Sequence, residues 1–185
     1  SDVYKRQQEH GARTVMYVSN DNTPATEYAD YKFFSFAEDD VLCEAIYTYQ
    51  ITMLARFLKN AGDFADYDTF MDEFAQITPY LIKAKEAYEA PAKAMAEDFK
   101  DVDYHMVVGS GMLWGEAYDY AMCILEEMQW IKTKSIHAAE FFHGTIELCE
   151  DDTSIIMLYG EDETRPLMDR VMNFTKMLED EKGVK

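Results

Sequence analysis

The sequence predicts an α/β fold, in which a mainly parallel β-sheet carries helices on both faces. Short apolar runs recur along the chain, and helical stretches of about 15 residues or more separate them. Glycine turns follow several of the runs, as they do where a buried strand leads into a helix. With 185 residues, of which 48% are apolar, the chain is long enough for one sizeable core, or for one domain and part of another.

The first sixty or so residues predict two strands followed by a helix. Residues 13–19 (RTVMYVS) and 31–36 (YKFFSF) are the strands, and a loop-forming run (NDNTPAT) separates them. The helix is expected over residues 41–60, just after three acidic residues whose charge is favourable at a helix N-terminus (Glu38, Asp39 and Asp40). Residues 1–8 (SDVYKRQQ) fit none of these elements and are interpreted as a non-native leader.

The middle of the chain predicts helices only. Residues 68–100 have a helical pattern that Pro79 and Pro91 interrupt. Because each proline lacks a backbone N–H, we expect two or three short helices here. This acid-rich stretch, residues 61–103, is interpreted as a linker between two α/β halves.

The second half predicts strand, glycine turn and helix twice. An apolar run at residues 106–108 ends in Gly109-Ser110-Gly111, and a helix follows. Its apolar stripe has a 3.6-residue period and consists of Leu113, Ala117, Tyr120, Ile124 and Met128. A further strand is expected over residues 154–159 (SIIMLY). After a turn, Thr164 is expected to cap a helix that runs to about residue 180.

Charge excludes some classes of partner. The formal net charge is −19, from 36 acidic against 17 basic residues. Such a surface repels phosphate backbones, so nucleic acid is not expected as a partner. An anionic substrate would need local donors such as backbone N–H groups at a helix N-terminus.

Cysteine use and hydropathy indicate a cytoplasmic protein. The three cysteines are widely spaced in apolar patterns, which is typical of buried cytosolic thiols. No apolar run reaches the length of about 18 residues that a membrane span needs, and no signal peptide is visible. We therefore expect no membrane partner.

The Gly109-Ser110-Gly111 turn is the first candidate site. Free N–H groups converge where such a turn joins a strand to a helix, so it could hold a phosphate. The dinucleotide-binding spacing would place another glycine at position 114, which is occupied by Trp114. A tight turn without a ligand is the alternative.

Carboxylates and histidines make the second candidate site. Glu126 and Glu127 end the long helix, and successive helical residues turn by about 100°, so the two should have different surroundings. His143 follows 16 residues after Glu127, which gives the carboxylate and the imidazole that proton transfer requires. The alternatives are a solvated helix end, a structural histidine, or a metal site made by His137, Glu140 and His143. No HExxH or CxxC pattern supports metal, and none is predicted.

The run from Gly109 to Leu148, with LEEMQW around Glu127 and AAEFFHGTIEL around His143, resembles the second half of double sugar-isomerase (SIS) domain proteins. Within that group it is most similar to the fructosamine-6-phosphate deglycases. The resemblance extends over nearly all of residues 9–185 and includes ATPA near the start and SIIMLYGEDETR near the end. The isomerase half of glucosamine-6-phosphate synthase shares the glutamate–histidine spacing.

The resemblance implies roles for individual residues. Glu127 would be the general base that moves a proton between C1 and C2 of the sugar, and His143 the acid/base at the ring oxygen. Glu140 would support the histidine. Ile124 stands where the synthase has lysine, which agrees with the deglycases, and Thr145 replaces the usual proline after His-Gly.

The resemblance also implies the activity and the assembly. Expected are a sugar-phosphate substrate, cleavage of phosphorylated Amadori products, no cofactor, and a homodimer whose sites are shared between protomers. Gly109, Ser110 and Gly111 are expected to bind substrate together with Glu140. The alternatives are a phosphosugar-sensing module without catalysis, and an amino-sugar or aldose–ketose phosphate isomerase.

The expected fold is accordingly flavodoxin-like, with SIS-type parallel sheets between layers of helices in two subdomains. Residues 9–60 would be the C-terminal part of the first subdomain, residues 61–103 the linker, and residues 104–185 the second subdomain. On this interpretation the chain is truncated at both ends, and the phosphate-binding loops would precede residue 9.

Overall fold

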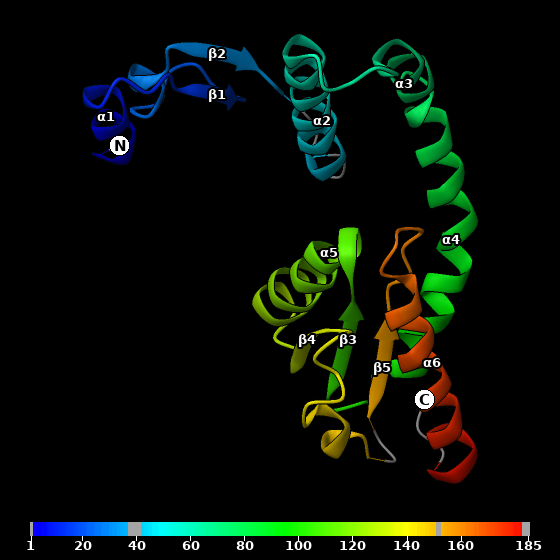
Figure 1. Cartoon of the computed structure of the whole chain (residues 1–185). Coiled ribbons are helices and arrows are strands. Elements are labelled where there is room, and N and C mark those ends of the chain that lie inside the picture. Colours follow the sequence, from blue (N-terminus) through cyan, green and yellow to red (C-terminus); the bar gives the residue numbers. More distant parts are fainter. Residues whose placement is uncertain (1, 37–41, 151–152, 183–185) are drawn as a thin grey trace. The chain divides into compact units, whose positions relative to one another are not determined.

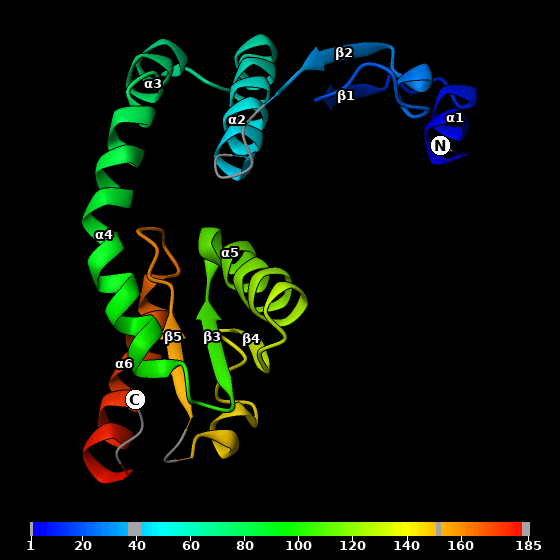
Figure 2. The same cartoon turned by 180° about the vertical axis from the view of Figure 1, so that it is seen from behind.

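The computed structural model describes residues 2–36, 42–150 and 153–182, and it divides the chain into two compact units. Unit 1 is Ser1–Lys85 and unit 2 is Glu86–Lys185 (Figures 1 and 2). In the part of the chain that is described, no helix combines the length and the apolar character that crossing a membrane requires.

Unit 1 holds a two-stranded parallel sheet and a series of helices. Its strands pair in the register Val15↔Tyr31 to Val18↔Phe34, and residues 19–30 supply the crossover of about a dozen residues that parallel pairing needs. The elements, in order, are α1 (Asp2–Glu9), β1 (Val15–Val18), η1 (Thr26–Tyr28), β2 (Tyr31–Phe34), α2 (Leu42–Ala61), α3 (Tyr67–Phe74) and the first part of α4 (Ile77–Phe99). Both predicted strands and the predicted helix are therefore present. The acidic residues expected ahead of the helix, and its expected first residue at position 41, lie outside the described residues.

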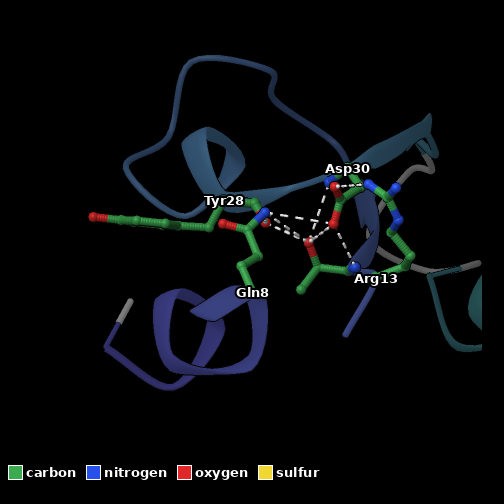
Figure 3. A network of polar contacts seen from close by, with 5 residues as sticks. Gln8, Arg13, Tyr28 and Asp30 are labelled. Carbon is green, nitrogen blue, oxygen red and sulfur yellow. Dashed lines mark hydrogen bonds and ion pairs between the residues drawn. The ribbon is translucent and has the colours of Figure 1, made fainter. Parts of the chain in front are cut away.

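The prediction that residues 1–8 fit no element is wrong, because α1 begins at Asp2. A polar network joins it to the strands that follow (Figure 3). The Gln8 amide donates to the Tyr28 carbonyl at 2.9 Å, while the Thr14 N–H and the Arg13 guanidinium donate to Asp30 at 2.8 and 3.0 Å. The backbone N–H of Thr14 and the Arg13 guanidinium lower the pKa of Asp30 to about 2.

The proline prediction is also wrong in part. Pro79 lies in the first turn of α4, as a proline should, but the helix runs on without a break through Pro91. The residues on either side, EAYEA and AKAMAE, are strong helix formers, and the carbonyl of Ala87 that loses its partner lies on an exposed part of the helix. High local propensity thus outweighs the loss of one hydrogen bond.

Unit 2 is built on a three-stranded parallel sheet of order β4-β3-β5. Its strands are β3 (His105–Gly109), β4 (Thr133–His137) and β5 (Ser154–Met157), and Val107 pairs with Ser135 on one side and Ile156 on the other. Helix α6 (Arg165–Lys182) and the pair α5 (Trp114–Asp119) and η4 (Tyr120–Met128) lie on opposite sides of this sheet (Figures 1 and 2). The predicted parallel α/β fold is confirmed.

Alternation along β3 gives the sheet its two buried faces. Met106 and Val108 pack on the face covered by α6, where Phe141 and Met168 are also fully buried. Val107 points to the other face and packs against α5 and η4.

Strand β4 was not predicted, since residues 133–137 were expected to belong to a polar segment. Its sequence, TKSIH, contains a single buried apolar residue, Ile136, and has no strong strand pattern. Strand β4 has a partner on one side only among the described strands. Tertiary pairing with the fully apolar β3 therefore decides its conformation.

The long helix after the glycine turn is not a uniform α-helix. It begins as a 3₁₀ turn (η3, Gly111–Leu113), continues as α5 and becomes a π-helix over η4. Ala117 in α5 and Ala121 in η4 are buried, and beyond them the wider turn of the π-helix departs from the 3.6-residue period. The stripe predicted to end at Met128 is wrong at that residue, which is 65% exposed.

Candidate active site in the second unit

The glycine turn lies at the carboxyl edge of the sheet, where β3 ends. A Cβ at Gly109 would lie 2.7 Å from both the Ala117 Cβ and the Leu113 carbonyl oxygen. Only glycine therefore allows α5 to fold back so closely onto its own strand. This accounts for the first glycine by packing alone.

Asp162 lies beside the backbone N–H donors of the same turn. Its carboxylate accepts the Met112 N–H at 2.8 Å and the Thr164 N–H at 2.8 Å, and a Cβ at Gly111 would collide with it. The Ser110 hydroxyl, which is buried, bonds to the Thr164 hydroxyl at 2.9 Å. The Thr164 hydroxyl, followed by the N–H groups of Met112 and Thr164, lowers the pKa of Asp162.

The Asp162 carboxylate therefore already accepts hydrogen bonds from backbone N–H groups at the turn, which the sequence analysis had proposed for binding a phosphate. Sequence reasoning placed Asp162 in a plain exit turn and gave the capping role at α6 to Thr164. In the structure the Asp162 carboxylate accepts from the Thr164 N–H and hydroxyl instead. The only available signal was an aspartate two residues before the helix, which is common at helix starts. Substrate binding by Gly109, Ser110 and Gly111 stays a prediction.

The adjacent glutamates at the end of η4 do have different surroundings. Glu126 is half-buried, and its carboxylate accepts the Thr133 hydroxyl at 3.0 Å. Glu127 is exposed. Its charge is one of the smaller influences that raise the pKa of Cys123, after the hydrogen bond to Asp119 and burial. The structure thus presents Glu127, and not Glu126, to a bound molecule.

Trp130 closes the helix in an unusual way. It has φ 61°, the only positive φ of any non-glycine residue in the described ranges. Its N–H bonds to the Glu126 carbonyl at 3.0 Å and the Ile131 N–H to the Leu125 carbonyl at 2.9 Å, so these bonds cap the end of the π-helix. Glycine usually takes this left-handed position, and another residue costs about 1 kcal/mol there. Sequence reasoning assigned Trp130 no role.

The histidine segment lies beyond β4. The His143 Nδ1 donates to a Glu140 carboxylate oxygen at 3.3 Å, since a carboxylate can only accept, and both side chains are more than 70% exposed. His137 instead accepts the Ala139 N–H at 3.1 Å and packs edge-on against Trp114, with ring centroids 5.3 Å apart. Within the described ranges, no three His, Cys, Asp or Glu residues are arranged to hold a metal ion.

Glu127 and His143 are carried by elements on opposite faces of the sheet. Helix η4 packs on the Val107 face, whereas Phe141 and Phe142, just before the histidine, pack on the α6 face against Phe174. No hydrogen bond or ion pair joins Glu127 to His143 in the part of the chain that is described. The structure brings Glu140 and His143 together but leaves Glu127 apart from them.

Known proteins support the resemblance seen in the sequence. The chain is 33% identical to the fructosamine deglycase of Bacillus subtilis over 170 residues, which are 90% of this chain and 51% of that protein. It is 23% identical to the fructoselysine 6-phosphate deglycase of Escherichia coli K12, with coverages of 92% and 49%. A solved structure of a Salmonella typhimurium LT2 protein assigned as a phosphosugar isomerase superposes with a TM-score of 0.83 at 31% identity, covering 94% of this chain and 55% of that one.

The chain is therefore similar in sequence to a fructosamine deglycase, and it has the SIS fold. No family model matches it. The chain spans about half the length of the curated relatives that it matches.

Proposed function

We propose that the full protein containing this chain cleaves fructosamine 6-phosphates to glucose 6-phosphate and a free amine or amino acid. The observation that carries the proposal is the exposure of both Glu127 and His143 in a chain 33% identical to a fructosamine deglycase. Two exposed groups, one a carboxylate and one an imidazole, are suited to move protons on a bound sugar.

In the proposed reaction Glu127 is the general base. It removes a proton from C1, which lies between the ketone at C2 and the amine nitrogen, and the proton is returned at C2. The product of this transfer is an imine at C1. Water adds to C1, the C1–N bond breaks, and the amine leaves an aldose phosphate behind. His143 acts at the ring oxygen, where ring opening requires a proton to be given and taken.

Glu140 is proposed to orient the histidine. Because Nδ1 of His143 donates to the Glu140 carboxylate, Nε2 is left for the substrate. The turn of Gly109, Ser110 and Gly111 stays in the proposal as a substrate-binding edge. Because the Asp162 carboxylate already accepts the Met112 N–H, the turn has fewer free N–H groups. It would therefore contact the substrate mainly through the exposed surface of Gly111.

A shared site is proposed for a two-fold homodimer. Since Glu127 and His143 are carried on opposite faces of one sheet, we infer that the histidine of one chain completes the site of the other. The resembling synthase uses its histidine in the same way. Symmetric pairing then gives two identical sites per dimer.

The same proposal assigns the parts of the chain. Residues 104–185 would be a second SIS subdomain, residues 9–60 the C-terminal part of a first, and residues 61–103 their connection. The structural division falls inside α4, after Lys85, and thus within the proposed connection.

Product analysis tests the proposal. The full protein would be incubated with a fructosamine 6-phosphate, and glucose 6-phosphate and free amine would be quantified together. Equal release of both is expected. The relative assigned as a phosphosugar isomerase favours a second candidate, in which an unsubstituted hexose phosphate is isomerised and no amine appears. Binding without any turnover would instead indicate a sensing module.

A further inference from the structure

The exposed tryptophan beside Glu127 is unexplained by the fold. Trp130 is 90% exposed, whereas Trp114 is half-buried against His137. It also holds a left-handed position that glycine would fill without strain. Backbone strain of this kind persists where function requires it. Since almost none of the indole is covered by the described chain, its packing does not account for the residue.

An open hollow of about 490 Å³ lies beside the indole. It is lined by Glu126, Trp130, Ile131, Lys132 and Thr133. The Glu126 carboxylate is already engaged by the Thr133 hydroxyl. Lys132, which is exposed, has no ion pair with any described residue, so its ammonium is available to a ligand.

The proposed chemistry places the amine of the substrate near Glu127, and the hollow lies beside the helix end that carries this residue. Glu127 would remove a proton from C1, and C1 is the carbon that bears the amine nitrogen. Whatever group is attached to that nitrogen must therefore lie within a few ångströms of the base. Trp130 is three residues further along, and its φ of 61° follows directly on the helix end that carries Glu127.

We propose that Trp130 and Lys132 are the residues that recognise the amine half of the substrate when that half is an amino acid. The indole would pack on its hydrocarbon part, and the Lys132 ammonium would attract its carboxylate. This inference rests on the proposed deglycase function. It adds a preference for carboxylate-bearing amines, which the general reaction does not require.

A matched pair of substrates tests the preference in the full protein. One is the fructosamine 6-phosphate of leucine, and the other is that of 3-methylbutylamine, which is leucine without its carboxylate. We expect wild-type kcat/KM to favour the leucine compound by about tenfold, as one exposed charge pair and its hydrogen bonds allow. Lys132→Met should remove most of this preference, acting mainly on the leucine compound.

Trp130→Gly separates recognition from a structural role. Losing the indole should lower kcat/KM about tenfold for both compounds, since stacking on the hydrocarbon part is shared. The melting temperature of the Trp130→Gly variant should equal or exceed that of wild type, because glycine adopts the left-handed conformation without strain. Met128→Ala, a change at another exposed apolar residue of the same turn, is the control and should alter neither quantity.

Several results would overturn the inference. If the melting temperature of Trp130→Gly drops in parallel with its activity, Trp130 has a structural role. If the Trp130→Gly dimer dissociates, Trp130 is a contact between the two copies of the chain. Unchanged discrimination in Lys132→Met, together with unchanged kcat/KM in Trp130→Gly, would exclude the hollow from substrate recognition. If the wild-type protein releases no amine from either compound, the proposed function itself fails, and this outcome is distinct from an active enzyme without a preference.

Discussion

The two units of the chain bury their apolar residues very differently. Unit 2 fully buries Phe141, Met106 and Met168 around a sheet that is covered on both faces. In unit 1 the large apolar residues stay exposed, for example Phe34 at 67% and Phe57 at 60%. The stability of unit 2 should therefore come from its own core, whereas unit 1 presents apolar surface that is typical of an interface.

Polar contacts take a larger part in unit 1. Its first strands are joined by the network around Thr14 and Asp30 (Figure 3), while the apolar residues of α2 face outward. Exposed ion pairs and hydrogen bonds of this kind contribute little each. We therefore expect unit 1 to be the less stable of the two, and residues from about 103 onward to be the part of residues 1–185 that folds when this stretch is expressed alone.

The largest predicted difference concerns core truncation. Phe141→Ala in residues 1–185 should destabilise the folded unit by about 3–5 kcal/mol, as for other buried aromatic residues. Phe57→Ala, in the exposed face of α2, should change the unfolding free energy by no more than about 0.5 kcal/mol. Urea unfolding is followed by far-UV circular dichroism for the helices of both units, and by tryptophan fluorescence for unit 2, which holds both tryptophans. Similar losses for the two variants would show that the units do not differ in this way.

The same difference explains which parts of the fold sequence analysis could predict. Strand β3 was predicted because residues 106–108 are apolar, and the helix α6 because a turn comes before it in the sequence. Strand β4 was missed because pairing with β3, and not its own sequence, makes it a strand. The π-helical turn was missed because it shifts the buried positions away from a 3.6-residue stripe.

A second prediction concerns where catalysis resides. In the full protein, Glu127→Gln should lower turnover at least about 100-fold while sugar-phosphate binding survives, since general acid–base groups typically contribute this much. Glu147→Gln, at an exposed glutamate, is the control in unit 2, and Glu27→Gln, also at an exposed glutamate, is the control in unit 1. Amine release by each variant is the measurement. Turnover within a few-fold of wild type for Glu127→Gln would remove this residue from the mechanism.

Less of the site than of the fold could be predicted. The spacing of Glu127 and His143 identified two exposed groups, and the contact between Glu140 and His143 follows from their separation of three residues. The hydrogen bond from the Met112 N–H to Asp162, 50 residues further along the chain, could not be predicted from local patterns. Contacts between loops that follow different strands depend on sheet order, which local patterns do not specify.

A third prediction tests whether one unit 2 completes the site of another. Full-length Glu127→Gln and His143→Asn proteins, each nearly inactive, are mixed and allowed to exchange subunits. With random pairing half of the dimers are hybrids, and each hybrid has one intact site, so activity should recover to roughly a quarter of wild type. If both residues acted within one chain, every site in the mixture would still carry one of the two substitutions, and activity would not recover. No recovery despite demonstrated exchange would therefore place the site in a single protomer.

The smallest expected effect is an acid response confined to unit 1. Hydrogen bonds from Thr14 and Arg13 lower the pKa of Asp30 from its ordinary value of 3.8 to about 2. Because the folded state binds this proton less readily, the carboxylate stabilises the fold above pH 4, and its contribution is lost as the pH falls towards 2. The protection factor of the Thr14 amide, which compares its exchange rate with the intrinsic rate at each pH, should fall over that range, while the buried Val107 amide in β3 stays protected. Asp30→Asn keeps an acceptor for the Thr14 N–H but has no titrating group, so its Thr14 exchange should lose this pH dependence. An unchanged dependence in the variant would assign the acid response to another group.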